Sequence, residues 1–295
     1  MSERHVLRAE DVRLGYGGRQ VLKGLSFDVP PGEVTMVVGP NGCGKSTLLR
    51  ALARLLRPTS GAVSLNGRDL RKMSTRQVAE ALAILPQTPV APAGIKVSEL
   101  VSQGRYPHQS WLRRWGSEDE EAVAQALLVT DTVDLAERPV DELSGGQRQR
   151  VWIAMVLAQR TGLLLLDEPT TFLDVPHQVE VLDLLTDLNR REGTTVVAVL
   201  HDLNLACRYA DRIVVMKGGT IVAEGPPTRI VTGELMRTVF GMDCHVVADP
   251  ASGTPLVVPI GRHHCAVETA AAGTAVPGSS APGTAAPEAD AVTRR

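Results

Sequence analysis

One stretch of the sequence decides the fold, and it reads Gly39-Pro40-Asn41-Gly42-Cys43-Gly44-Lys45-Ser46-Thr47. It matches the pattern G-x-x-x-x-G-K-S/T, which indicates a phosphate-binding loop where it joins a strand to a helix. A strand-type apolar run, Val34–Val38, comes directly before it, and the helix-type run Leu48–Leu52 follows. The pattern therefore stands in the context that predicts a nucleotide site rather than a structural glycine-rich turn.

Each residue type in such a loop has a chemical task. Glycines let backbone N–H groups point at phosphate oxygens, Lys45 reaches the β- and γ-phosphates, and the hydroxyl of Ser46 suits Mg²⁺. Cys43 has two interpretations. It is a redox switch if the helix N-terminus lowers its thiol pKa, or simply a small residue that fits the turn, which we favour.

Two further apolar runs also end in polar residues. Leu163–Leu166 is followed by Asp167 and Glu168, and Val196–Leu200 is followed by His201. Such runs are typical of strands buried on both faces of a parallel sheet, whose carboxyl ends bind phosphate-bearing ligands. We expect Asp167 to hold Mg²⁺ through water, Glu168 to act as general base, and His201 to contact the γ-phosphate. The alternatives are an ordinary acidic strand end and a structural histidine.

A second anion-binding motif opens a helix, and it reads Leu143-Ser144-Gly145-Gly146-Gln147. Ser144 and Gln147 have the spacing of a capping box, and the helix is expected to continue to about Gln159. The two glycines leave the first N–H groups bare, and a helix N-terminus of this kind binds anions. The loop at 39–47 already cradles a nucleotide, so this second helix needs a separate explanation.

Composition and charge narrow the function further. The 295 residues carry 31 Lys+Arg against 33 Asp+Glu, and the net charge of −2 gives no electrostatic reason to bind nucleic acid. The longest hydrophobic run, Val151–Ala158, is far shorter than the roughly 18 residues that a membrane-spanning helix needs. No apolar secretory segment follows the start, which predicts a cytoplasmic location. The 4 cysteines form no CxxC pair, which favours reduced thiols over disulfides or a zinc site.

The predicted fold class is α/β, with a parallel-sheet core, a small antiparallel β layer and an inserted helical subdomain. Alternation at Asp11–Leu14 before Gly15–Gly18 predicts an antiparallel hairpin, and Ala62–Gly67 predicts a strand entering a turn. The pattern between about 95 and 160 is helical, and Ser117–Glu120 predicts a capping box that begins one of its helices.

The composition changes past about Arg262, where Ala, Gly, Thr, Pro and Ser dominate. We therefore expect residues 1–262 to form the nucleotide-binding domain and 263–295 to be a disordered tail. His263–Cys265 is interpreted as a solvated stretch rather than a metal site, because no second cluster completes four ligands.

These motifs together resemble those of the ATP-binding subunit of an ABC transporter, over about residues 5–260. The resemblance implies a P-loop ABC-type nucleotide-binding domain with ATP and Mg²⁺ as cofactors. In that family two subunits pair head to tail, and each signature helix, here the one that begins at Ser144–Gln147, caps the ATP in the other's phosphate loop. The resemblance thus explains the second anion-binding helix.

Three further site residues follow from the resemblance alone. Tyr16 would stack on adenine, Gln87 would reach Mg²⁺ and the attacking water, and Asp174 would lie across the dimer interface. Without the resemblance they would be a turn tyrosine, a loop glutamine and a helix N-cap before Pro176.

The type of transporter is indicated by three stretches, Gly104–His108, Ser144–Met155 and Thr171–Asp174. They most resemble the ATPases of ferric siderophore, haem and cobalamin importers, and a siderophore is our first choice. The expected partners are membrane permease subunits, a second copy of the chain and, indirectly, a substrate-binding protein, which implies the cytoplasmic face of the cell membrane.

The segment Gly104–Trp115 is expected to dock the permease rather than nucleic acid; its cationic and aromatic residues are Arg105, Tyr106, Trp111, Arg113, Arg114 and Trp115. Two other classes remain as alternatives. One is a soluble ABC ATPase that acts on nucleic acid or ribosomes, and the other is an exporter ATPase.

Overall fold

The computed structural model describes residues 5–109 and 115–261. Its strands are β1 (Leu7–Tyr16), β2 (Arg19–Val29), β3 (Val34–Val38), β4 (Ser60–Leu65), β5 (Arg68–Asp69), β6 (Leu82–Leu85), β7 (Leu163–Asp167), β8 (Thr195–Val199), β9 (Arg212–Lys217), β10 (Thr220–Gly225), β11 (Cys244–Ala248) and β12 (Pro255–Pro259). Its α-helices are α1 (Lys45–Leu52), α2 (Thr75–Ala81), α3 (Val97–Ser102), α4 (Ser117–Val129), α5 (Gly145–Ala158), α6 (Val175–Glu192), α7 (Leu203–Tyr209), α8 (Pro227–Ile230) and α9 (Gly233–Phe240). Short 3₁₀ helices are η1 (Leu70–Lys72), η2 (Gln103–His108), η3 (Val133–Leu135) and η4 (Val140–Glu142).

Some sequence predictions fall outside the described residues. They concern the tail at 263–295, the stretch His263–Cys265, and Trp111, Arg113 and Arg114 of the docking segment.

The central sheet has the strand order β10-β9-β3-β8-β7-β6. Strands β9, β3, β8, β7 and β6 run parallel, and β10 pairs with β9 in the antiparallel sense. Every residue of β3, β7 and β8 is buried, as their apolar runs predict. Because β3, β8, β7 and β6 are neighbours that run in the same direction, the loops that follow them leave the sheet at one edge.

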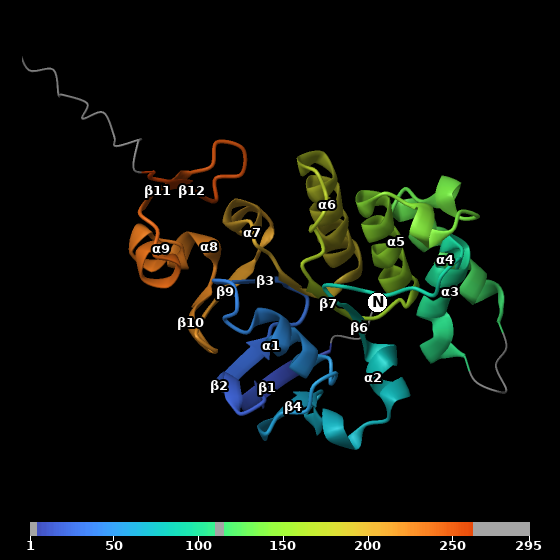
Figure 1. Ribbon diagram of the computed structural model, residues 1–295, viewed down its shortest axis with the longest axis horizontal. Helices are drawn as coiled ribbons and strands as arrows, with labels where there is room; N and C mark the ends of the chain where they lie inside the picture. Colours follow the sequence, from blue (N-terminus) through green and yellow to red (C-terminus); the bar gives the residue numbers. More distant parts are fainter. Residues whose placement is uncertain (1–4, 110–114, 262–295) are drawn as a thin grey trace, which may run out of the picture. The chain divides into compact units, whose positions relative to one another are not determined.

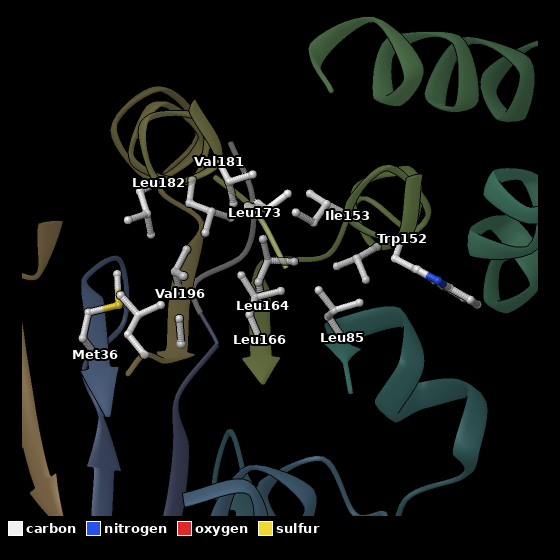
Figure 2. Packing of buried hydrophobic residues seen from close by; sticks show 14 of the residues in the cluster. Met36, Leu85, Trp152, Ile153, Leu164, Leu166, Leu173, Val181, Leu182 and Val196 are labelled. Atoms are coloured by element: carbon white, nitrogen blue, oxygen red, sulfur yellow. The ribbon is translucent and has the colours of Figure 1, made fainter. Parts of the chain in front are cut away.

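The sheet has a hydrophobic core on each face. Side chains of one strand alternate between the cores, so that Met36 packs in one and Val37 in the other. Figure 2 shows the core where β3, β7 and β8 meet α6 and α5, with Leu164 and Leu166 of β7 beneath Ile153 and Leu173. Helices α3 and α4 contribute to this same core.

The opposite core lies between the sheet, α1 and a second sheet of order β2-β1-β4-β5. In Figure 1 these strands and α1 lie on the other side of the parallel strands from α6 and α7. Strands β1 and β2 form the predicted hairpin, whose turn residues Gly17 and Gly18 both have positive φ. The turn after β4 is also as predicted, with positive φ at Asn66 and Gly67.

The described residues between 95 and 160 form α3, η2, α4, η3, η4 and α5. Helix α5 begins as its motif predicts, because the Ser144 hydroxyl accepts from the Gln147 N–H and the Gln147 side chain accepts from the Ser144 N–H. The capping box expected from Ser117 is wrong. Gly116 is the N-cap of α4, and the Asp119 carboxylate accepts from the Gly116 N–H at 3.2 Å. Asp119 thus has a second partner in this region, because its Oδ1 also accepts from Arg105 at 2.8 Å.

Parallel core, antiparallel layer and helical insertion together confirm the predicted α/β class. Residues after β10 add α8, α9 and the antiparallel hairpin β11–β12, which packs on α7 and α9.

The close approach of β4 to β1 within the second sheet predicts the effect of one glycine substitution. Gly61 in β4 has φ +80°, and a Cβ there would lie 2.3 Å from the Asp11 carbonyl oxygen. We expect Gly61→Ala to lower the free energy of unfolding by roughly 3 kcal/mol. Gly67→Ala is the matched control: its φ is +75°, but a Cβ would meet nothing within 4 Å. The control is expected to lose about 1 kcal/mol. Equal losses in chemical denaturation would contradict the steric explanation.

Candidate active site

A cavity of about 690 Å³ opens at the edge of the sheet where β3, β8, β7 and β6 end. Predicted site residues supply most of its wall. The lining residues are Tyr16, Arg19, Gln20, Val21, Lys23, Asn41, Gly42, Gly44, Lys45, Ser46, Thr47, Gln87, Glu168, His201 and Gly218. The strand order therefore brings together side chains that are far apart in the sequence.

The phosphate-binding loop holds its lysine in place through its own backbone. The Lys45 ammonium donates to the carbonyl oxygens of Gly39 at 2.7 Å and Pro40 at 3.2 Å, and Lys45 is only 6% exposed. Gly39 must be glycine, because a Cβ there would lie 2.2 Å from the Met216 carbonyl oxygen. The Lys45 ammonium is thus held against the loop that leads into the N-terminus of α1. A cation beside the N–H groups of a helix N-terminus is suited to bind a phosphate chain.

A turn that the sequence did not single out supports this loop from behind. Gly218 and Gly219 join β9 to β10, and the Gly219 N–H donates to the Cys43 carbonyl at 3.0 Å. The Gly219 carbonyl in turn accepts from the Lys23 N–H at 3.1 Å. Arg19, Gln20, Val21 and Lys23 of β2 line the cavity beside this turn.

The interpretation of Cys43 as a small residue fits its surroundings. Burial raises the pKa of the Cys43 thiol, although Lys45 and backbone N–H groups act in the opposite direction. The suggested lowering of its pKa by the helix N-terminus is therefore wrong, because desolvation of the thiolate outweighs it.

Asp167 is a buried carboxylate with one unused oxygen. Its Oδ1 accepts from the Ser46 hydroxyl at 2.9 Å, and its Oδ2 has no hydrogen-bond partner. Burial raises the pKa of Asp167, and the neighbouring Glu168 charge adds to this effect, while the Ser46 hydrogen bond opposes it. An orphaned carboxylate oxygen beside a serine hydroxyl fits the all-oxygen ligand set that Mg²⁺ prefers.

Glu168 is held between two partners at the cavity wall. Its Oε1 lies 2.6 Å from His201 Nε2, and its Oε2 accepts from the Thr171 hydroxyl at 3.1 Å. Glu168 has φ +57°, and its N–H donates to the Val199 carbonyl at 3.2 Å, which turns the side chain off the end of β7. A carboxylate fixed in this way can accept a proton from a water molecule in the cavity.

Tyr16 and Gln87 both line the cavity. Tyr16 ends β1 and is 49% exposed, so its side chain is accessible to a ligand in the cavity. Gln87 follows β6 and lines the cavity together with Glu168.

The signature residues Ser144–Gln147 and Asp174 are not among the residues that line the cavity. At the start of α5, Gly145 and Gly146 face the loop before α6, where a Cβ on Gly146 would lie 3.3 Å from Leu173. Phe172 in that loop is 80% exposed. Asp174 is the N-cap of α6, but its carboxylate contacts the His177 ring instead of capping a helix N–H. The loop at 39–47 therefore contributes to the wall of the cavity, whereas the N-terminus of α5 does not.

The docking segment requires one correction. Arg105 was expected at its surface, but it is 4% exposed and pairs with Asp119 at 2.8 Å. Tyr106 and Trp115 are 64% and 40% exposed and line a shallow hollow with Glu99, Ser102, Gln103 and Gln109. Of the helices in the described ranges, none combines the length and the apolar character needed to cross a bilayer.

The raised pKa of Asp167 predicts that its charge lowers the stability of the unliganded chain, although the charge is needed for ligand binding. Its folded form favours the neutral acid, so stability is lost as pH rises from the ordinary pKa of Asp toward the raised one. Asp167→Asn should raise the free energy of unfolding at neutral pH by about 1 kcal/mol. The gain should vanish below about pH 4. MgATP should stabilise the wild type in thermal melts but not this variant. A variant that is less stable than the wild type and still responds to MgATP would contradict the assignment.

Comparison with known proteins agrees with this geometry. A family model described as ABC transporter matches residues 22–171. The probable siderophore transport system ATP-binding protein YusV of Bacillus subtilis strain 168 is 56% identical over 265 residues, which cover 90% of this chain and 96% of that protein. The ferric enterobactin transport ATP-binding protein FepC of Escherichia coli K12 is 52% identical over 87% of this chain and 94% of its own. The hemin import ATP-binding protein HmuV of Rhodococcus jostii RHA1 is 44% identical over 86% of each chain.

Solved structures are similar as well. One, described as the inward-facing conformation of a metal-chelate type ABC transporter, superposes with a TM-score of 0.75 at 30% identity and covers 88% of this chain and 99% of that one. The dimeric bacterial ABC transporter cassette MJ0796 superposes with a TM-score of 0.68 at 28% identity and covers 75% and 98%. The match of sequence, fold and site geometry identifies the chain as a member of the ABC transporter family, in which it is an ATP-binding protein.

Proposed function

We propose that the chain is the ATP-hydrolysing subunit that powers import of a ferric siderophore through separate membrane permease subunits. One observation carries the ATPase assignment. The carboxylate of Glu168, paired with His201, faces the same cavity as Lys45 and the phosphate-binding loop. This geometry supports a role for Glu168 as the proton acceptor beside the last phosphate of a bound ATP.

The proposed roles follow from the positions of the residues. Tyr16 stacks on adenine, residues 39–47 hold the phosphates, and Lys45 neutralises the terminal ones. Ser46, Asp167 and Gln87 would hold Mg²⁺, which neutralises charge that develops on the phosphate oxygens. Glu168 takes a proton from the attacking water as general base, and His201 contacts the γ-phosphate while it orients Glu168.

The proposed active unit is a head-to-tail dimer with two ATP molecules between the subunits. The position of the signature helix supports this arrangement, because the bare N–H groups at Gly145 and Gly146 lie outside the chain's own cavity. In a head-to-tail pair Ser144–Gln147 of one copy would cap the ATP held by the other, and Asp174 would lie at the interface. The dimeric cassette reported above supports the same assembly.

The proposed location is the cytoplasmic face of the cell membrane, where the subunit binds its permease. Exposed Tyr106 and Trp115, with the hollow beside them, supply the aromatic surface for this contact. We further propose that 1–262 is the ABC ATP-binding domain and that about 95–160 is its helical subdomain. A substrate-binding protein would deliver the cargo to the permease without touching this chain.

The siderophore assignment rests on the relatives. Those named for siderophore and ferric enterobactin transport are 56% and 52% identical to this chain, against 44% for the hemin importer subunit. Haem and cobalamin remain the alternative cargoes, because no residue of an ATPase subunit meets the cargo.

The role of Glu168 predicts a variant that binds but does not turn over. Glu168→Gln keeps the shape of the side chain and loses the base, so ATP hydrolysis should fall by about 10²–10⁴-fold while MgATP affinity is retained. The control Glu224→Gln, at an exposed carboxylate on β10, should hydrolyse ATP like the wild type. Turnover of Glu168→Gln near the wild-type rate would remove Glu168 from the proposed role.

The cargo is tested by growth. A deletion strain should fail to grow with its ferric siderophore as sole iron source and should grow normally on excess inorganic iron. The wild-type gene should restore growth, and Lys45→Ala should not, because the cation that holds the phosphates is lost. Unimpaired siderophore use together with lost haem or cobalamin use would reject the siderophore and leave the ATPase assignment intact.

A further inference from the structure

The 3₁₀ helix η2 carries one exposed side chain and, next to it, one buried side chain. Tyr106 points to the surface proposed to receive the permease, where it is 64% exposed. Its neighbour Arg105 is 4% exposed and extends into the helical part of the chain. One short segment therefore carries both a surface contact and a buried cation.

Arg105 bridges two helices. Its Nε donates to Asp119 Oδ1 in α4 at 2.8 Å, and its Nη1 donates to the Ala158 carbonyl at 2.9 Å. Ala158 is the last residue of α5, where carbonyl groups lack partners within the helix and carry its negative dipole end. The planar guanidinium serves the carboxylate and the helix end at once, which the single ammonium of a lysine cannot do with the same geometry.

Further contacts join η2 to the same end of α5. His108 Nε2 lies 2.7 Å from the Gln159 carbonyl oxygen, and a Cβ on Gly104 would lie 2.2 Å from the Met155 carbonyl. The Gln159 side chain also donates to the Leu82 carbonyl at 3.2 Å, at the start of the strand that leads to Gln87. The end of α5 is thus connected to the proposed docking surface and to the strand before the cavity.

Helix α5 runs unbroken from this end to the signature residues, because Ser144 is its N-cap. We propose that Arg105 is a positioning residue that makes η2 and α5 move as one body, so that permease contact at η2 shifts the signature end that caps the partner's ATP. The proposal rests on the proposed function, because it requires a permease on the Tyr106 surface. A buried pair of this kind transmits movement only if both partners are held, and Arg105 holds α4 and α5 together.

A purely structural role for Arg105 makes a different prediction. Its loss would then lower the thermal stability of the chain and all activities in parallel. A positioning role instead predicts that loss of Arg105 leaves permease contact at η2 intact and removes only its effect on the start of α5.

The test compares backbone hydrogen exchange of the full chain alone and assembled with its permease subunits, for the wild type, Arg105→Lys and Arg105→Gln. In the wild type, permease assembly should slow exchange in η2 and also change it at 145–149. In both variants the slowing in η2 should remain, and the change at 145–149 should fall by about fivefold or more. Glu137→Gln is the matched control, since it breaks the exposed Lys96–Glu137 pair in the same helical part, and it should behave like the wild type.

A second readout is the amount of ferric siderophore imported per ATP hydrolysed in proteoliposomes. The variants should lower this ratio, while ATP hydrolysis by the isolated chain stays within about twofold of the wild type. An unchanged response at 145–149 in the variants would overturn the proposal, as would activities that fall only in step with the folded fraction. A wild-type chain that neither binds a permease nor supports import would instead reject the proposed function. If Arg105→Gln does not fold, Arg105→Lys keeps the charge and decides the matter.

Discussion

The geometry of the candidate site depends on two negatively charged side chains at the end of β7, a strand that is buried along its whole length. Asp167 and Glu168 are 1% and 8% exposed, and carboxylates at that depth need compensation. The chain supplies Ser46 to one oxygen of Asp167, and His201 and Thr171 to Glu168, but it leaves Asp167 Oδ2 without a partner. A cation bound at Asp167 Oδ2 would supply the missing compensation. The strand order β3-β8-β7-β6 brings these groups together. It places the phosphate-binding loop, His201, the two carboxylates and Gln87 along one edge of the sheet.

The N-terminus of helix α5 is a second feature that points to more than one chain. The N-terminus of α5 at Ser144–Gln147, which we propose to bind an anion, is not part of the wall of the chain's own cavity. If two copies share each ATP site, both ends of α5 have a role. Its first turn would contact the partner's ATP. Its last carbonyl, that of Ala158, accepts from Arg105 beneath the proposed permease surface. Hydrolysis, dimer closure and transport would then be linked through one helix.

Local patterns predicted the parts of the site that local physics determines. The phosphate-binding loop, the buried strands and the Ser144 cap each depend on a few consecutive residues, and the structure has them where the sequence indicates. Contacts between distant segments were not predictable. Gly219 supports the loop only because β9 lies beside β3, and no signal near residue 219 reports that strand order. Arg105 looked like a surface cation because its partners, Asp119 and the end of α5, become neighbours only in the folded chain. The N-cap of α4 likewise differs from the prediction: it is Gly116 and not Ser117, and the Asp119 carboxylate accepts from its N–H.

The sharing of each ATP site between two chains is tested most directly by mixing two inactive variants and measuring ATP hydrolysis. Lys45→Ala lacks the phosphate-binding cation, and Ser144→Arg fills the signature end with bulk and charge. If sites are shared head to tail, a mixed dimer has one site with both defects and one site with neither. An equal mixture should therefore regain about a quarter of the wild-type rate, since half of the dimers are mixed and each has one intact site. A mixture no more active than the average of the two variants measured separately would contradict the account.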